Sequence, residues 1–186
     1  MSESPFAQTL AGDLVLPTER FELRPLSSGD LAGFFAELSD PEVVRLTNLE
    51  PLAHLDQAAA IMDRIETARA EGRGVRWAIH DRASGEHVGT CGFNSLVWTY
   101  GCRGEIGYDV VRGWWGRRVM AEALPAMLGF GFDRLGLRRI EALVLPENQR
   151  SWALLERHGF EREGLLRDHG FWKDAFHDVY LYAKLG

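Results

Sequence analysis

The stretch GWWGRRVMAEAL, at residues 113–124, places a glycine and two arginines just before an expected helix. The first backbone N–H groups of a helix have no partner within the helix, and the helix dipole makes that end positive. With Arg117 and Arg118 beside it, this helix start predicts a binding site for an anion such as a phosphate. A plain turn with solvated arginines and core tryptophans explains the same residues about equally well. The spacing matches neither the Gly-Lys-Ser/Thr loop of nucleotide-binding proteins nor the Gly-x-Gly-x-x-Gly dinucleotide turn.

A second polar pair, Asn148 and Ser151, stands in LPENQRSWALLERHGF at residues 145–160. It directly follows RIEALVL, residues 139–145, an almost continuous apolar run that is typical of a strand covered on both faces. Asn148 can cap the short helix that begins here, and Ser151 lies three residues later at the same helix entry. Both are also ordinary capping residues, and the local sequence alone favours that structural role.

The chain has 186 residues, with 21 basic against 27 acidic side chains and a formal net charge of −6. Its length suits one domain with a real core, and its acidic balance disfavours a general nucleic-acid binder. No apolar run approaches the ~20 residues that a membrane span needs, and the N-terminus lacks the pattern of a secretory signal. Cys91 and Cys102 have no metal-ligand spacing and fit a reducing compartment. We therefore expect a cytoplasmic protein that does not associate with membranes.

The hydrophobic patterns predict a mixed α/β order in one domain, residues 18–186, preceded by an N-terminal extension, residues 1–17. Apolar residues at every third or fourth position, together with capping signals such as Ser27 with Asp30, predict helices. These helices are expected over residues 31–38, 55–71 and 149–158, and between GWWGRR and Gly136. Alternating or continuous apolar residues predict strands over residues 20–26, 75–79, 88–93, 105–111, 139–145, 163–172 and 177–183.

Taken in order, the motifs resemble the GNAT superfamily of acetyl-CoA-dependent N-acetyltransferases, and within it the branch of ribosomal-protein N-terminal (alanine/serine) acetyltransferases. The motifs that carry the resemblance are Ile106-Gly107-Tyr108, Trp115–Ala123, Asn148 with Ser151, Leu155–Phe160, Glu163–Arg167 and His177–Tyr182. The likeness covers roughly residues 18–185. It implies an α/β fold with a central twisted sheet, mostly antiparallel and of about seven strands, which splays in the middle and is flanked by helices.

The resemblance also implies where acetyl-CoA binds. The diphosphate of coenzyme A would lie on main-chain amides at the start of the central helix, and the pantetheine arm would pair with the strand near Val110. Asn148 would contact the same arm. The residues implied for the diphosphate turn are Trp115, Gly116, Arg117, Arg118, Val119 and Met120. The family usually places glycine where this chain has Arg118. Of two alternatives we favour ordinary helical backbone angles there, which an arginine tolerates, over a positive φ, which would strain the residue by about 1–2 kcal/mol.

Amine acetylation requires that the amine lose a proton before it attacks, and the departing thiolate benefits from a proton. Glu105 is the first candidate for the base, although a surface glutamate of the strand explains this residue equally well. Asp168 and His169 are the alternatives. The resemblance implies that Ser151 protonates or stabilises the thiolate, because Leu155 stands where many GNAT enzymes carry a tyrosine acid.

The resemblance implies an amine acceptor, either a small molecule or a protein N-terminus. The candidates for contacting the acceptor lie in segments that flank the acceptor channel of the family; they are Trp98, Tyr100, Asp168, His169 and Trp172. About half of the aromatic side chains in these segments are expected in the core instead. Acetyl-CoA is the expected cosubstrate, with no metal and no nucleic-acid partner, and a homodimer is left open. Arg118 and the missing helix tyrosine suggest one alternative, a non-catalytic acyl-CoA sensor or interaction module on the same fold. A second alternative, an unrelated phosphate-binding protein, leaves the NQRS and HDVYLY motifs unexplained.

Overall fold

The computed structural model of the chain describes residues 4–99 and 101–186, and an eight-stranded twisted sheet forms its centre. The strands are β1 (Leu16–Pro17), β2 (Phe21–Pro25), β3 (Val75–Asp81), β4 (His87–Val97), β5 (Arg103–Val110), β6 (Arg139–Val144), β7 (Glu161–Trp172) and β8 (Ala175–Leu185). Their order across the sheet is β1-β2-β3-β4-β5-β6-β8-β7, and among the described residues only the β5–β6 pair is parallel. The sequence predicts seven of these strands, and the additional one is the two-residue edge strand β1.

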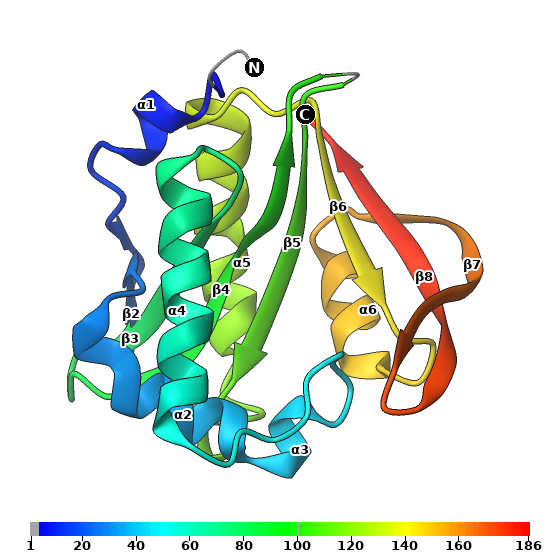
Figure 1. Ribbon diagram of the computed structural model, residues 1–186. Helices are drawn as coiled ribbons and strands as arrows, with labels where there is room; N and C mark the ends of the chain where they lie inside the picture. The colour runs from blue at the N-terminus through cyan, green and yellow to red at the C-terminus, as the bar shows by residue number, and fades with distance from the viewer. Residues whose placement is uncertain (1–3, 100) are drawn as a thin grey trace.

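Helices cover both faces of the sheet, and α4 and α5 lie on opposite sides of it (Figure 1). The helices are α1 (Ala7–Leu10), α2 (Leu31–Ser39), α3 (Pro41–Val44), α4 (Leu55–Ala70), α5 (Val119–Gly129) and α6 (Gln149–Arg157), with the short turns η1 (Ser28–Asp30), η2 (Arg112–Trp114) and η3 (Phe130–Arg134). Ser27 and Asp30 form the predicted capping box, and the Asn148 side chain caps α6 as predicted. Within the described residues, every helix is too short or too polar to cross a bilayer.

Two apolar cores hold these layers together, one on each face of the sheet. The larger core packs α5 against sheet residues such as Trp77 and Phe93, and it includes Phe6 and Leu10 from the N-terminal segment. The smaller core packs α2 and α4 against the other face, around Phe34, Leu38 and Ala78. The N-terminal segment thus shares its core with the rest of the chain, because its apolar residues are buried against the sheet.

The sheet opens between its two parallel strands. β5 pairs with β6 only from Arg103–Glu105 against Arg139–Glu141. Beyond these positions β5 continues to Val110 beside β4, while β6 continues to Val144 beside β8. The two strands diverge toward their carboxyl ends, as Figure 1 shows. This is the splay that the sequence resemblance implies.

Candidate active site

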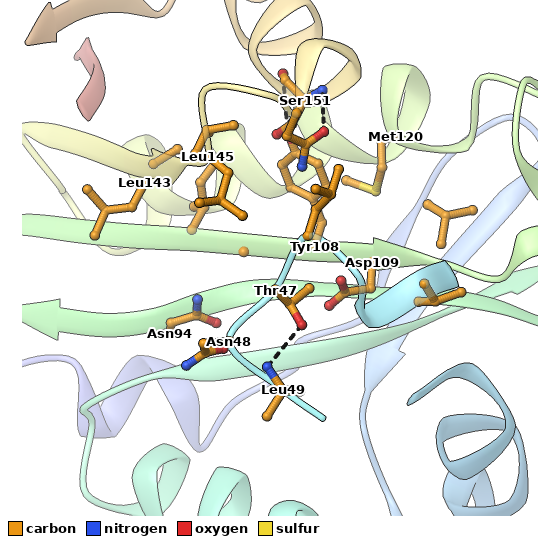
Figure 2. A pocket seen from close by; sticks show the side chains of 18 of the residues that line it. Thr47, Asn48, Leu49, Asn94, Tyr108, Asp109, Met120, Leu143, Leu145 and Ser151 are labelled. Carbon is orange, nitrogen blue, oxygen red and sulfur yellow. Dashed lines mark hydrogen bonds between the residues drawn. The ribbon is translucent and has the colours of Figure 1, made fainter. Parts of the chain in front are cut away.

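The gap between β5 and β6 opens into a cavity of about 1580 Å³. Its walls come from the diverging ends of both strands, the starts of α5 and α6, the segment 42–49 and the turn-proximal end of β7, residues 169–172. β5 runs through the cavity and divides it. Figure 2 shows Met120, Leu143 and Ser151 on one side of this strand, and Asn48 and Asn94 on the other.

The edge of β5 that faces the gap carries peptide groups that β4 does not use. The Val111 amide donates to the Val88 carbonyl at 3.0 Å. Hydrogen-bonded and non-bonded positions alternate along an antiparallel pair, so the peptide groups of Tyr108 and Val110 point away from β4 and into the gap. The Val110 carbonyl there accepts a hydrogen bond from the Trp115 indole at 2.7 Å. The remaining gap-facing groups form an open edge that an extended, amide-containing molecule can pair with.

The start of α5 contributes a second set of backbone donors to the cavity wall. Gly116 has φ +76, a backbone conformation that glycine adopts without strain. The helix begins at Val119, and its N-cap residue provides no side-chain hydrogen bond to the first amides. These amides belong to Val119, Met120 and Ala121, which all line the cavity. They form a positive, donor-rich surface that suits an anion.

Ser151 and Tyr108 meet on the side of β5 where Met120 and Leu143 lie. Asn148 caps α6 by accepting a hydrogen bond from the Ser151 amide at 3.2 Å, which sets the direction of the first turn. The Ser151 hydroxyl Oγ lies 2.7 Å from the phenolic oxygen of Tyr108 (Figure 2). Burial raises the pKa of Tyr108 to about 12, so this phenol keeps its proton near neutral pH. The pair can therefore donate a hydrogen bond or a proton toward the gap.

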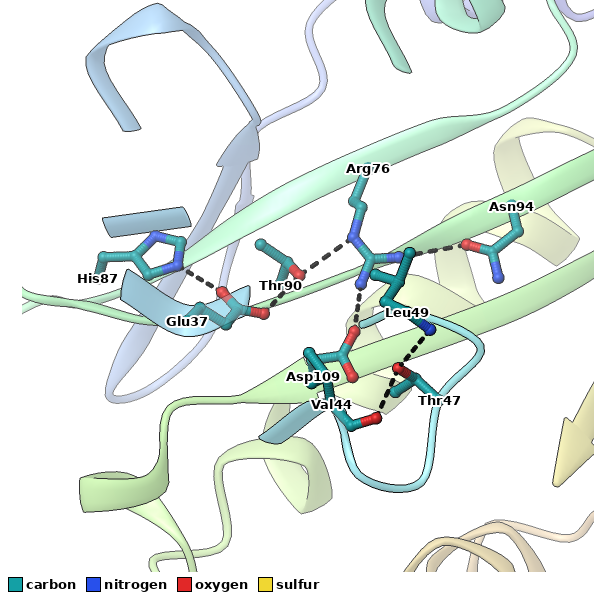
Figure 3. Close-up of polar contacts among 9 residues, drawn as sticks. All are labelled: Glu37, Val44, Thr47, Leu49, Arg76, His87, Thr90, Asn94 and Asp109. Atoms are coloured by element: carbon teal, nitrogen blue, oxygen red, sulfur yellow. Dashed lines mark hydrogen bonds and ion pairs between the residues drawn. The ribbon is translucent and has the colours of Figure 1, made fainter. Parts of the chain in front are cut away.

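On the other side of β5, Arg76 organises a group of polar side chains (Figure 3). Its guanidinium donates to Thr90 Oγ1 at 3.0 Å, to Asn94 Oδ1 at 3.2 Å and to Asp109 Oδ2 at 2.7 Å. Burial raises the pKa of Asp109, and the charge of Arg76 opposes that rise. Glu105 lies on the same face of β5, two residues before Gly107 and four before Asp109. Burial also raises the pKa of Glu105, while the side chain of Asn94 opposes this shift.

A family model described as the acetyltransferase (GNAT) domain matches residues 20–161 of the chain. The chain belongs to the GNAT acetyltransferase family. It is 39% identical over 170 residues to an uncharacterized N-acetyltransferase, p20, of Bacillus licheniformis, covering 91% of this chain and 95% of that protein. It is 31% identical over 124 residues to the [ribosomal protein uS5]-alanine N-acetyltransferase of Escherichia coli, covering 62% of this chain and 61% of that protein. Among solved structures, Mycobacterium smegmatis RimJ in complex with CoA-disulfide superposes with a TM-score of 0.82 at 28% identity, covering 93% of this chain and 87% of that one.

This GNAT acetyltransferase transfers an acetyl group to an amine, as its named relatives do, and its family uses acetyl-CoA. The relatives named as N-acetyltransferases favour the enzyme over the sensor alternative. Because the sheet opens between β5 and β6, the acetyltransferase has room for two reactants on one strand. An enzyme that only brings a thioester and an amine together in the right orientation can gain most of its rate from proximity.

The backbone at Arg118 differs from our prediction. We expected ordinary helical angles, but the residue has φ 60 and ψ 29, in the left-handed region. This conformation costs about 1–2 kcal/mol for an L-residue that has a Cβ atom. The prediction was wrong because Arg118 is the N-cap of α5, outside the helix, where the chain reverses direction after Gly116. Its side chain nevertheless belongs to the cavity wall.

The other arginine of the pair, Arg117, does not line the cavity. The Arg117 guanidinium stacks over the Trp114 ring at 4.9 Å, and its carbonyl accepts a hydrogen bond from Arg20 at 3.1 Å. A different arginine contributes a cation to the cavity wall. Arg150 lines the cavity with its guanidinium 5.4 Å from the centre of the Trp115 ring. The signal for Arg150 was present in the NQRS motif, between the two residues that sequence analysis singled out. The predicted Trp115, Gly116, Val119, Met120, Val110, Asn148 and Ser151 all line the cavity.

The predicted acceptor residues are only partly brought together. His169 and Trp172 line the cavity, as does Glu105. Trp98 does not, because its ring packs edge-on against Phe6 at 6.3 Å in the larger core. Asp168 also lies outside the cavity wall, at an irregular point of β7 where its amide donates to Asp178 at 2.9 Å. Tyr100 lies outside the described residues.

Sequence reasoning missed the segment that closes the acceptor side. Thr47, Asn48 and Leu49 follow α3 and lie against β5 from the side of α2 (Figure 2). The Thr47 hydroxyl accepts a hydrogen bond from the Leu49 amide at 3.1 Å and donates to the Val44 carbonyl at 2.9 Å, which holds the turn in shape. These residues have no periodic pattern, so nothing in the local sequence indicates their place.

Proposed function

We propose that this acetyltransferase moves the acetyl group of acetyl-CoA onto the α-amine at the N-terminus of a protein. The division of the cavity by β5 carries this proposal. Tyr108 and Ser151 lie on one side of the strand, whereas Glu105 and Asp109 alternate to the other. Thioester and amine can therefore reach the same strand from opposite sides and meet in one complex.

The donor side has the groups that coenzyme A needs. The first amides of α5 and the cations Arg118 and Arg150 suit its diphosphate. The gap-facing peptide groups of β5 near Val110 suit the amides of the pantetheine arm. Asn148 uses its side-chain oxygen for the helix cap, which leaves its NH₂ group for the same arm. The related RimJ of Mycobacterium smegmatis, solved with CoA-disulfide, supports this assignment.

The residues on either side of β5 divide the proton transfers between them. Glu105 takes a proton from the ammonium group of the acceptor, directly or through a water, and leaves a neutral amine. As the new carbon–nitrogen bond forms and the carbon–sulfur bond breaks, the nitrogen gives up a second proton and the sulfur gains one. Ser151 gives its hydroxyl proton to the sulfur and takes up the second proton of the nitrogen, directly or through a water, so that the serine ends unchanged and coenzyme A leaves as the thiol. Glu105 releases the first proton to solvent, and Tyr108 hydrogen-bonds to Ser151 and keeps its own proton at neutral pH.

A protein N-terminus is the acceptor class that the relatives favour. One relative is named for the alanine of ribosomal protein uS5. The acceptor side of this chain is bounded by the segment 42–49 and by His169 and Trp172, which leaves an open approach for an extended peptide. A peptide backbone entering there can present its first nitrogen to Glu105.

Paired peptides test this proposal. One peptide begins with a free alanine or serine and contains an internal lysine, and its partner is identical except for a blocked N-terminus. With acetyl-CoA and the purified chain, mass spectrometry should locate acetyl groups on the free α-amine and find none on the blocked peptide. Acetylation of the lysine in both peptides, or acetylation of small polyamines alone, would contradict the proposal that the acceptor is a protein N-terminus.

A further inference from the structure

A cluster of buried histidines lies outside the cavity, on the hairpin formed by β3 and β4. His80 and His87 are direct cross-strand neighbours at a point where the register shifts. Their rings stand 5.7 Å apart, centre to centre, and nearly perpendicular to each other. Neither lines the cavity between β5 and β6, and the proposed acetyl transfer uses neither.

A carboxylate from the overlying helix holds each of these histidines. Asp30 of η1 lies 2.9 Å from His80 Nε2, and Glu37 of α2 lies 2.6 Å from His87 Nε2. The two acids are seven residues apart, about two helical turns, so they project from the same side of the helix. Gly33 lies between them, and a Cβ atom there would sit 2.7 Å from the His87 ring carbon Cγ. This side of the helix thus has two carboxylates, and the lack of a side chain at Gly33 leaves space for the His87 ring.

The second nitrogen of each histidine is the unexplained feature. Nδ1 of His80 and Nδ1 of His87 are buried and have no hydrogen-bond partner among the described residues. Each of these side chains is only 9% exposed. Buried polar atoms are nearly always paired, because an unpaired one loses its contact with water without compensation. His87 has the arrangement found in metal-binding histidines, because its Nε2 is held by the carboxylate of Glu37 while its Nδ1 keeps a free lone pair.

We infer that Asp30, His80 and His87 bind a divalent transition-metal ion, with zinc as the best match; His87 would bind through its free Nδ1, and His80 and Asp30 through their facing atoms Nε2 and Oδ1, which lie 2.9 Å apart. One ligand atom from each residue lies within 4.8 Å of the others. Tetrahedral zinc with bonds near 2.0–2.1 Å needs ligand atoms about 3.3 Å apart, so the widest separation would have to close by up to about 1.5 Å when the ion binds. Two imidazoles and a carboxylate are a ligand set that zinc commonly takes, with water in the fourth position. Glu37 would fix the orientation of His87 from outside the ligand shell.

A metal ion at this place would clamp α2 onto the β3–β4 hairpin. Glu37 also accepts a hydrogen bond from Thr90, which accepts one from Arg76 at the cavity wall (Figure 3). The clamp would therefore stabilise the support beneath the acceptor side of the cavity. Because the ion would bind the folded chain and not the unfolded one, it should raise Tm.

Zinc titration of the full chain, after dialysis against a chelator, tests this inference. Calorimetry should show saturable binding of one Zn²⁺ ion per chain, and Tm should rise by several degrees on zinc addition. The variants His80→Gln and His87→Gln should each lower zinc affinity about tenfold or more. His158→Gln removes the histidine that follows α6 as its C-cap, away from the cluster, and should bind zinc as the unmodified chain does.

Two further measurements test the inference even if the histidine variants fail to fold. Asp30→Asn keeps a side-chain oxygen for the capping box and removes a charged ligand, so it should also weaken zinc binding. Cobalt(II) bound to the unmodified chain should give the visible bands of tetrahedral nitrogen and oxygen ligation, without the thiolate bands that Cys91 or Cys102 would add. Absence of saturable zinc binding, full zinc affinity in both histidine variants, or thiolate bands with cobalt would each overturn the inference.

Discussion

Glu105 stands at the last position where β5 pairs with β6, and its half-buried carboxyl lies at the cavity wall. Replacing it by glutamine keeps the size of the side chain and removes the base. We predict that Glu105→Gln lowers kcat at pH 7 by about 10²-fold or more, because general-base catalysis typically contributes that much. The dissociation constant for acetyl-CoA, measured by calorimetry, should stay unchanged, because the base faces the acceptor side.

The pH profile separates this role from a structural one. Burial raises the pKa of Glu105, and the negative charge of neighbouring Glu141 adds to the rise. The base must be unprotonated, so kcat should fall as the pH drops through that raised pKa. Glu141→Gln removes the repulsion and should move the acid limb of the profile to lower pH, with kcat at neutral pH retained. Full activity of Glu105→Gln would remove Glu105 from the mechanism.

Ser151 and Tyr108 should act as a unit, because their oxygens share a 2.7 Å hydrogen bond. We predict that Ser151→Ala lowers kcat more than Tyr108→Phe does, and that the double variant is no slower than Ser151→Ala alone. Residues that work through each other give such non-additive effects. Steady-state kinetics of the four proteins checks this cycle. Effects that multiply in the double variant would show that the two hydroxyls act independently.

At this scale the sequence allowed part of the site to be predicted. Ser151 and Asn148 were predicted from ordered motifs, and their helix-entry geometry follows from local capping. The partnership of Ser151 with Tyr108 was missed, because these residues are 43 positions apart and meet only where α6 closes over the gap. Arg117 and Arg150 show the same limit. Whether a long cation points into a cavity depends on which aromatic ring it packs against.

Among the elements, the start of α5 combines a strained residue with the proposed diphosphate site. Arg118 has φ 60, which costs about 1–2 kcal/mol for a residue with a Cβ atom. We predict that Arg118→Gly raises the free energy of unfolding by up to about 1 kcal/mol, because the gain is partly offset by the greater freedom of glycine in the unfolded chain. Urea unfolding of the variant and the unmodified chain measures this difference.

Arg118→Ala is the matched control, because alanine keeps the strain and removes the guanidinium. It should unfold at about the same urea concentration as the unmodified chain. Both variants should bind acetyl-CoA severalfold more weakly, since each loses a cation beside the diphosphate. An alanine variant as stable as the glycine variant would contradict the left-handed conformation at this position.

Elements with strong periodic patterns were predictable, and their caps marked their ends. The capping box at Ser27 correctly marked the start of α2, and the predicted range 31–38 ends within one residue of the observed helix. The segment 42–49 was not predictable, because its turn depends on Thr47 bonding to its own neighbours and on contact with β5. The backbone at Arg118 was mispredicted for a related reason. The position of a helix start cannot be read to one residue from composition.

At the scale of the whole molecule, the ordered motifs were enough to predict the fold and the splay between β5 and β6. The resemblance implied a mostly antiparallel sheet that splays in the middle, and the structure adds that the splay lies at a parallel strand pair. The polar group around Arg76 was not foreseen. It joins residues from α2, β3, β4 and β5, so it exists only once the sheet and its covering helix are assembled.

The central claim is that the amides at the start of α5 hold the diphosphate of acetyl-CoA while β5 holds its arm. Calorimetry with acetyl-CoA and with S-acetylpantetheine, which lacks the diphosphate and adenosine, tests it most directly. Charge-assisted hydrogen bonds are worth about 1.5–3 kcal/mol each, so two of them correspond to about 100-fold or more in affinity. We predict one saturable site for acetyl-CoA and binding of S-acetylpantetheine at least about 100-fold weaker. Equal affinities for the two compounds, or no detectable binding of acetyl-CoA, would contradict the claim.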